Sequence, residues 1–322
     1  MRYTLKSLVA VSLLGALSSA ALAQAVKVDA AIPPYKKISG VTGSLNSIGS
    51  DTLNNVMTLW AEGFKAIYPS VVIGIEGKGS GTAPPALIEG TAQLGPMSRE
   101  MKSTELDAFE KKFGYKPTAY KVAIDSLAIF VHKDNPIKGL NLQQLDGIFS
   151  STLKRGGPSI EKWGDLGLTG EWRTKPLSLY GRNSASGTYG YFKEHALEKG
   201  DYKSTVKEQP GSSAVVQGVA SDLGGIGYSG IGYKTSGVRA LPIAEKGDKY
   251  VEPNYPNCLN GDYPIARFLF VYVNKKPGAP LDKLVGEFIK FVESKEGQQV
   301  VVKDGYFPLT KEIIDQDLKA TK

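Results

Sequence analysis

Cysteine is nearly absent from this sequence, since Cys258 is the single cysteine among 322 residues. A chain with one cysteine cannot form an intramolecular disulfide. Its stability therefore has to come from packed hydrophobic cores, and a chain of this length is long enough to build them. We expect the Cys258 thiol itself to have no functional role.

Histidine is also scarce, and the groups of a catalytic centre do not occur together. His132 ends an apolar segment and His195 lies in a predicted helix, and neither has a metal-ligand spacing to cysteine or carboxylate residues. Ser186 lacks the G-x-S-x-G pattern of a nucleophile elbow. The sequence therefore predicts a protein that is not an enzyme and that has no cofactor and no metal site.

Long apolar runs are missing except at the start of the chain. Arg2 and Lys6 accompany the apolar residues 8–17, and residues 21–23 (Ala-Leu-Ala) form a small-x-small cleavage site, which is the pattern of a secretory signal peptide over residues 1–23. No later run approaches the roughly 18 apolar residues that a membrane-spanning helix needs. We expect a soluble mature chain that is exported to the periplasm or secreted.

Charge of one sign is only slightly in excess. The 39 lysine and arginine residues outnumber the 32 aspartate and glutamate residues, and the net charge of +7 falls to +5 without the signal peptide. The basic residues are scattered along the chain rather than clustered. This distribution argues against nucleic acid as a partner and fits a small anionic ligand.

Strands alternate with amphipathic helices through the rest of the chain. Apolar segments at 122–131 and 267–274 predict buried strands, and apolar residues recur at helical spacing over 53–67 and 281–292. This alternation predicts an α/β fold with largely parallel sheets.

Three glycines match a nucleotide-binding pattern without its context. Gly225, Gly227 and Gly230 read as G-x-G-x-x-G, but no helix pattern follows them and no strand–helix–strand unit surrounds them. We interpret this segment as a strand and a tight turn that pack closely against other backbone.

The stretch from 178 to 197 carries the strongest ligand signal. Its predicted strand ends at Tyr180, Arg182 follows, and the Ser-Gly-Thr run at 186–188 stands where the next helix begins. A helix start offers unpaired backbone N–H groups and the positive end of the helix dipole, and a guanidinium adds a fork of donors. Together these groups predict an anion-binding site.

Two earlier turns have the same make-up, with glycine and hydroxyl residues between a strand and a helix. The first covers residues 49–52 (Gly-Ser-Asp-Thr), and the second covers residues 77–82 (Gly-Lys-Gly-Ser-Gly-Thr). Glycine lets the backbone approach a ligand closely. The lysine of the second turn precedes glycine rather than serine or threonine, so this turn is not a nucleotide P-loop.

These motifs, in this order, resemble the phosphate-binding proteins of bacterial phosphate-specific ABC transporters, which are type II periplasmic binding proteins. The resemblance covers nearly the whole mature chain and is carried by residues 49–52 ahead of a Trp60-containing helix, Gly79-Ser80-Gly81, Gly95-Pro-Met-Ser98, Arg182-x-x-x-Ser186-Gly187-Thr188 and Gly225-Ile-Gly-Tyr228.

The resemblance implies two α/β lobes, each a mixed, mostly parallel sheet flanked by helices, with the ligand enclosed between them. Two crossing segments, near Tyr120 and Asp262, would join the lobes. The implied divisions are an N-terminal extension at 24–40, lobe 1 at 41–119 plus 262–322, and lobe 2 at 120–261.

The resemblance also implies a function, which is binding of inorganic phosphate by a monomeric solute-binding protein and its delivery to the membrane permease and ATPase of an ABC importer. Each hydrogen bond to a charged oxyanion is worth about 1.5–3 kcal/mol, so several together can offset the desolvation of a buried dianion. The phosphate ligands that the resemblance implies are Ser50, Asp51, Thr52, Ser80, Ser98, Arg182, Ser186, Gly187 and Thr188.

Two positions depart from the family pattern. Ser98 stands where the family usually has an aspartate, and Ser184 stands where an aspartate often steadies the arginine. A carboxylate in the cleft selects phosphate, because it accepts the proton that phosphate carries and repels sulfate. With Ser98 in that place, Asp51 becomes the candidate proton acceptor. The alternative for Asp51 is a plain helix N-cap.

Two other functions stay open. A secreted phosphatase on the same scaffold would turn over phosphate esters, and an extracellular adhesion protein would bind phosphate only as a secondary property. Sustained hydrolysis of an aryl phosphate would identify the first, and cell fractionation would identify the second.

Overall fold

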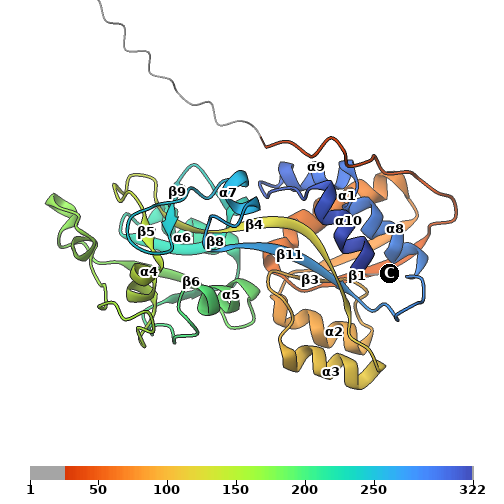
Figure 1. Ribbon diagram of the computed structural model, residues 1–322, viewed down its shortest axis with the longest axis horizontal. Helices are drawn as coiled ribbons and strands as arrows, with labels where there is room; N and C mark the ends of the chain where they lie inside the picture. Colours follow the sequence, from red (N-terminus) through yellow and green to blue (C-terminus); the bar gives the residue numbers. More distant parts are fainter. Residues whose placement is uncertain (1–25, 321–322) are drawn as a thin grey trace, which may run out of the picture.

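The computed structural model describes residues 26–320, and the predicted signal peptide lies outside the described residues. The chain forms two α/β lobes that lie side by side (Figure 1). The long strands β4 (Thr118–His132) and β11 (Ala266–Val273) run from one lobe to the other. Over this part of the chain no helix is long and apolar enough to cross a membrane.

Lobe 1 combines the first elements of the chain with the last ones. Its strands are β1 (Gly43–Ile48), β2 (Val71–Glu76) and β3 (Gly95–Met97). Its helices are α1 (Asn54–Ile67), α2 (Ala83–Glu89), α3 (Ser103–Phe113), α8 (Lys283–Val292), α9 (Lys295–Lys303) and α10 (Lys311–Ala320).

Lobe 2 is formed by the middle of the chain. Its strands are β5 (Leu140–Asn141), β6 (Ser178–Arg182), β7 (Lys207–Gln209), β8 (Gly225–Gly230), β9 (Val238–Ala240) and β10 (Ile243–Ala244). Its helices are α4 (Leu142–Phe149), α5 (Gly187–His195), α6 (Ser212–Ser221) and α7 (Tyr255–Leu259).

One sheet continues through both lobes in the order β3-β11-β4-β8-β6-β7, with β9 also paired to β4. Strand β4 pairs with β11 as far as Ser126 and with β8 from Leu127 onward. The change of partner therefore comes after Tyr120, the residue near which the first crossing segment was expected. The sheets are mixed: β1–β2, β6–β7 and β6–β8 are parallel, whereas β4 and β11 are antiparallel to their neighbours. The alternation of strands and helices did not predict these antiparallel pairs. The β4–β11 pair is antiparallel because one crossing strand leaves lobe 1 and the other returns to it.

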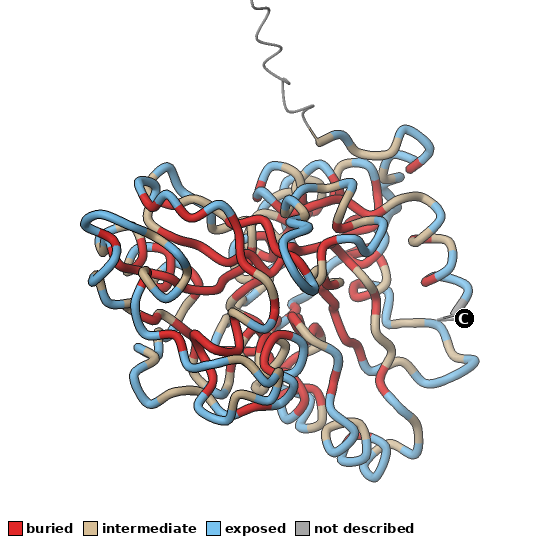
Figure 2. The backbone as a smooth tube through the Cα atoms, turned by 60° about the vertical axis from the view of Figure 1, so that its left-hand side comes forward, coloured by how far each residue is buried: buried red, intermediate tan, exposed pale blue. Residues whose placement is uncertain are grey.

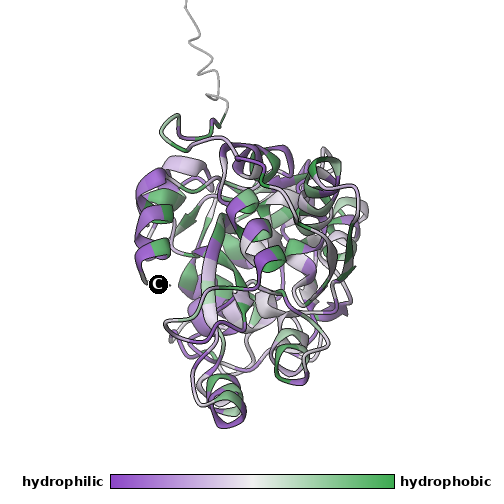
Figure 3. Ribbon diagram, turned by 90° about the vertical axis from the view of Figure 1, so that its right-hand side faces the viewer, coloured by the Kyte–Doolittle hydropathy of each residue, from purple (hydrophilic) through white to green (hydrophobic). Residues whose placement is uncertain are grey.

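The core of lobe 1 lies where α1 and α8 pack on the sheet. The apolar residues of both helices line one face, so that Trp60, Phe64 and Phe288 are fully buried. The Trp60 indole N–H donates a hydrogen bond of 2.8 Å to the Gly297 carbonyl. Figure 3 turns the right-hand side of Figure 1 toward the viewer. The helices on this side carry hydrophilic and hydrophobic residues next to one another, as amphipathic surface helices do.

The core of lobe 2 is built around aromatic rings from α4, α5 and β8. The Phe192 and Tyr228 rings stack with their centroids 4.2 Å apart, and the Phe149 ring meets both edge-on. The same hydrophobic cluster includes Ile124 and Leu127 of the crossing strand β4, and Phe307 and Leu309, which follow α9. Buried residues gather in the strands through the middle of the molecule, and exposed residues lie in the loops around them (Figure 2).

The described part of the N-terminal extension is tied to lobe 1. The Tyr35 hydroxyl donates to Glu287 of α8 at 2.8 Å and lies 2.8 Å from the Tyr68 hydroxyl just after α1. Burial and hydrogen bonding by these partners raise the pKa of Tyr35, so its hydroxyl stays protonated and keeps donating.

One local expectation was wrong, and one helix was not predicted. The strand expected to end at Tyr180 continues through Gly181 to Arg182, because these residues pair with β7. Helix α10, which the sequence analysis did not predict, packs against β4. In both cases a partner that is remote in the sequence supports the element.

Candidate ligand site between the lobes

The residues implied as ligands gather at one place, where the lobes meet. Thr52 Oγ1 of lobe 1 lies 2.9 Å from Thr188 Oγ1 of lobe 2. The Asp51 carboxylate of lobe 1 lies 3.1 Å from the Arg182 guanidinium of lobe 2. Two segments that are far apart in the sequence, residues 51–52 and residues 182–188, therefore share one site.

Ser80 and Ser98 lie against the start of α5. The Ser98 N–H donates to Ser80 Oγ at 3.0 Å, and the two hydroxyl oxygens are 3.3 Å apart. A Cβ atom on Gly187 would overlap with Ser80 Oγ and lie 2.6 Å from Ser98 Oγ. Only glycine allows this close approach of the helix to the two serines.

The N-terminus of α5 supplies backbone donors. Ser186 is the N-cap, and its Oγ accepts a hydrogen bond of 3.3 Å from the Tyr189 N–H. Gly187 and Thr188 are the first helical residues, so their N–H groups have no intrahelical partner and carry the positive end of the helix dipole. Ser50 of the first turn is buried, and its N–H donates to the Pro96 carbonyl.

Arg182 is a buried guanidinium that is only partly paired. Its side chain is 1% exposed, and Nη1 donates to Ser212 Oγ at 2.7 Å and lies beside Asp51. Nη2 reaches only the Pro210 carbonyl at 3.4 Å, and Nε has no hydrogen-bond partner within residues 26–320. Burial lowers the pKa of Arg182 and the Asp51 charge opposes this shift. Because an unpaired buried donor costs about 1–3 kcal/mol, the open donors favour an anionic ligand here.

Asp51 does not cap its own short turn. Its Oδ2 atom accepts hydrogen bonds from the Ser212 N–H at 2.8 Å and the Ser212 hydroxyl at 2.7 Å, in addition to the contact with Arg182. The carboxylate therefore caps α6 of the opposite lobe. Ser184 is exposed and makes no hydrogen bond to Arg182 in the part of the chain that the structure describes.

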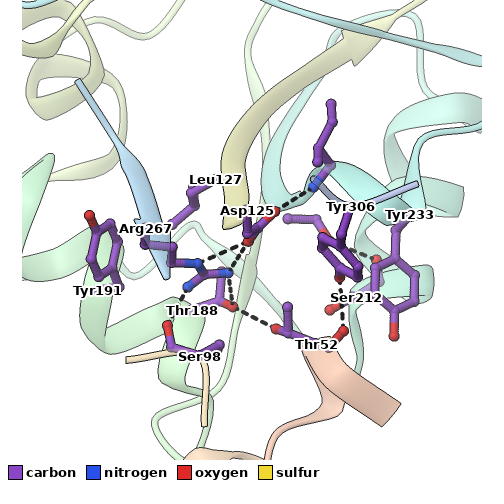
Figure 4. A network of polar contacts seen from close by, with 12 residues as sticks. Thr52, Ser98, Asp125, Leu127, Thr188, Tyr191, Ser212, Tyr233, Arg267 and Tyr306 are labelled. Carbon is purple, nitrogen blue, oxygen red and sulfur yellow. Dashed lines mark hydrogen bonds and ion pairs between the residues drawn. The ribbon is translucent and has the colours of Figure 1, made fainter. Parts of the chain in front are cut away.

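A second buried guanidinium, that of Arg267, contacts two residues of the site and was not predicted from the sequence. Arg267 forms a two-pronged ion pair with Asp125, with Nε and Nη2 at 2.9 and 2.7 Å from Oδ2 (Figure 4). Its Nη1 donates to the Ser98 carbonyl at 2.8 Å, and Nη2 also donates to Thr188 Oγ1 at 3.0 Å. The signal in the sequence was a charge inside each of two apolar strands, because a charge is rarely buried without a partner.

Two tyrosine hydroxyls donate hydrogen bonds to the backbone of the first turn, residues 49–52. The Tyr233 hydroxyl of lobe 2 donates to the Asp51 carbonyl, and the Tyr306 hydroxyl donates to the Thr52 carbonyl, both at 2.8 Å. Burial raises the pKa of both tyrosines, so they remain donors. Neither had a sequence signal, because each acts only through a contact made by the folded chain.

Three hydroxyl groups of the site are able to donate. Ser80, Ser186 and Thr188 each accept a hydrogen bond from a protein N–H group on their oxygen. Since a hydroxyl has one proton to give, each O–H remains free to donate to a neighbour or a ligand. A site lined by such donors, by helix N–H groups and by a guanidinium is suited to a small oxyanion.

A donor-lined site between two α/β lobes, with two strands crossing from one lobe to the other, is characteristic of the class of two-lobed periplasmic binding proteins. A family model of the PBP superfamily domain matches residues 37–296.

The relatives narrow this class. The chain is 59% identical to the phosphate-binding protein PstS of Pseudomonas aeruginosa over 98% of both chains. It is 30% identical to the phosphate-binding protein PstS of Staphylococcus epidermidis over 80% of this chain and 76% of that protein. The chain belongs to the family of phosphate-binding proteins PstS.

Solved structures share the fold. A protein from Clostridium perfringens, described as a phosphate ABC transporter substrate-binding protein with bound phosphate, superimposes with a TM-score of 0.71 at 27% identity and covers 83% of this chain and 100% of its own. An ABC-type phosphate transport receptor from Vibrio cholerae superimposes with a TM-score of 0.65 at 22% identity, covering 82% of this chain and 100% of its own.

Proposed function

We propose that this protein binds inorganic phosphate between its lobes as the phosphate-binding component of an ABC phosphate transporter, and that it is a transport receptor rather than an enzyme. Membership of the PstS family supports the ligand and the transport role. The observation that carries the assignment to this site is Arg182, which is buried with open donors beside the start of α5. From the same family role we propose the importer's membrane permease and ATPase as partners.

The ligand set that we propose joins both lobes around one oxyanion. Arg182 supplies the charge, the N–H groups of Gly187 and Thr188 supply the helix start, and the hydroxyls supply further donors. The full set of site residues is Ser50, Asp51, Thr52, Ser80, Ser98, Arg182, Ser186, Gly187 and Thr188, in which Asp51 contributes through its contact with the Arg182 guanidinium.

We also propose a location and a division of the chain. The signal pattern of residues 1–23 supports delivery to the periplasm, where a monomer would collect phosphate. Lobe 1 would comprise 41–119 plus 262–322 and lobe 2 would comprise 120–261, with β4 and β11 shared by both sheets. The extension at 24–40 precedes lobe 1.

Isothermal titration calorimetry on the phosphate-stripped mature chain tests this function. We expect phosphate to bind, and Arg182→Lys to weaken binding by about 10-fold to 100-fold, because lysine keeps the charge but loses the fork of donors. Arg239→Lys is the matched control, since Arg239 bonds the Asn135 and Ile137 carbonyls in lobe 2. Binding of sulfate or molybdate with none of phosphate would overturn the assignment.

A further inference from the structure

The carboxylate that contacts Arg182 comes from the opposite lobe. We propose that Asp51 is a positioning residue that orients the Arg182 guanidinium for phosphate only when the two lobes are closed. Closure and anion recognition are then coupled through this one pair. The inference rests on the proposed function, because it assigns a role within the same phosphate site.

The geometry around Asp51 is a closed triangle of hydrogen bonds. Arg182 Nη1 donates to Ser212 Oγ at 2.7 Å, the Ser212 hydroxyl donates to Asp51 Oδ2 at 2.7 Å, and Nη1 lies 3.1 Å from the same Oδ2. The Ser212 N–H adds a fourth contact at 2.8 Å. A planar guanidinium whose Nη1 is held from two directions has little freedom to rotate.

This arrangement uses one end of the guanidinium and leaves the other open. Nε has no partner among the described residues, and Nη2 makes only a 3.4 Å contact with the Pro210 carbonyl. Nε and Nη2 form one edge of the fork, which matches two oxygens of an oxyanion at once. Asp51 and Ser212 therefore present this edge to the ligand.

Opening of the lobes would dismantle the triangle. Asp51 belongs to lobe 1, whereas Arg182, Ser212 and Tyr233, which donates to the Asp51 carbonyl, all belong to lobe 2. In the part of the chain that the structure describes, Arg182 pairs with no carboxylate of lobe 2. The guanidinium of an open molecule consequently loses the group that orients it, and a ligand that needs the oriented edge favours the closed state.

The proposal differs measurably from a direct role of Asp51 as the acceptor of the phosphate proton. A positioning carboxylate acts through Arg182, so its loss should weaken phosphate binding by the same factor at each pH. An acceptor would instead alter the preference between the two protonation states of phosphate, and the ratio of dissociation constants at pH 6 and pH 8 would change.

A double-mutant cycle on the mature, phosphate-stripped chain tests the coupling. Calorimetry with inorganic phosphate would compare the wild type, Asp51→Asn, Arg182→Lys and the double variant. We expect Asp51→Asn to weaken binding by about 10-fold. We expect it to cause almost no further loss in the Arg182→Lys background, and to leave the ratio of dissociation constants at pH 6 and pH 8 as in the wild type.

Asp222→Asn is the matched control, because Asp222 accepts from the Tyr180 hydroxyl on the strand that carries Arg182 but lies outside the triangle. If the Arg182→Lys variant binds phosphate too weakly to titrate, Ser212→Ala replaces it as the second substitution of the cycle. The proposal is overturned if Asp51→Asn weakens phosphate binding as much in the second variant as in the wild type. It is also overturned if Asp51→Asn changes the ratio of dissociation constants at pH 6 and pH 8. A wild type that binds no phosphate would instead refute the proposed function.

Discussion

Gly187 lies where the start of α5 touches lobe 1, and its missing side chain is what allows the contact. An added Cβ would overlap with Ser80 Oγ and lie 2.6 Å from Ser98 Oγ. We predict that Gly187→Ala prevents closure and weakens phosphate binding by about 100-fold or more, as measured by calorimetry. Thermal stability should not fall, because alanine favours the helical backbone.

Gly190→Ala is the control for this prediction on the same helix. Its Cβ would meet the Arg99 Cδ atom at 3.4 Å, which is an ordinary contact. Phosphate affinity should be unchanged in this variant. Equal effects of the two substitutions would contradict the role assigned to Gly187.

Arg267 is the residue whose removal should cost most stability near the site. Arg267→Met leaves the Asp125 carboxylate buried without its cation, and such a change costs about 3–5 kcal/mol in the free energy of unfolding. Urea unfolding measures this loss. Addition of Asp125→Asn should recover part of it, and a loss below about 1 kcal/mol would argue against an essential pair.

At the scale of elements, β8 shows why a glycine pattern can mislead. Gly225, Gly227 and Gly230 match a dinucleotide motif, yet β8 is a strand between β4 and β6 with α6 against it. A Cβ on Gly227 would lie 2.9 Å from both the Tyr180 carbonyl oxygen and a methyl group of Val215. The glycines therefore serve close packing, as the sequence analysis inferred.

We predict that Gly227→Ala lowers the free energy of unfolding by about 1–3 kcal/mol, because the added methyl group overpacks the space between β6 and α6. Chemical denaturation monitored by circular dichroism checks this value. Gly286→Ala in α8 is the comparison, since its Cβ would meet Leu281 at 3.5 Å. That variant should be neutral or stabilised by up to about 1 kcal/mol, and a similar loss in both would refute the packing argument.

At the scale of the whole molecule, buried carboxyl groups make stability depend on pH, and Glu293 has the larger effect near neutral pH. Glu293 ends α8 and is 6% exposed, and burial, followed by the nearby charge of Asp317, raises its pKa from 4.5 to about 8. The folded state therefore holds a proton that the unfolded chain releases between these values. Stability contributed by the neutral form is present below pH 4.5 and is lost as the pH rises toward 8.

We predict that Glu293→Gln flattens this part of the pH profile, whose slope approaches about 1.4 kcal/mol per pH unit in the wild type. Urea unfolding at pH 5, 6.5 and 8 measures the slopes. Burial raises the pKa of Asp304 to about 6. The wild type and Glu293→Gln should therefore both lose stability as the pH rises toward 6. Identical profiles above pH 6 would show that Glu293 does not titrate as argued.

Elements with strong local signals could be predicted, whereas those that depend on a partner could not. The apolar spacing of α1 and the helix start of α5 at residues 186–188 are properties of neighbouring residues, and both were predicted. Strands β5, β7, β9 and β10 have two or three residues each, too few for a periodic pattern. They are strands only because another strand lies beside them.

The sequence by itself determined the alternation of the longer strands and helices, the absence of an intramolecular disulfide, and the three glycine and hydroxyl turns that supply anion donors. These features follow from residues within a few positions of one another. Only the tertiary structure decided that Asp51 faces Arg182 and Ser212, and that Arg267 joins Asp125 to Thr188. Such pairs join distant segments, and their geometry is set by how the two lobes pack, which no local pattern encodes.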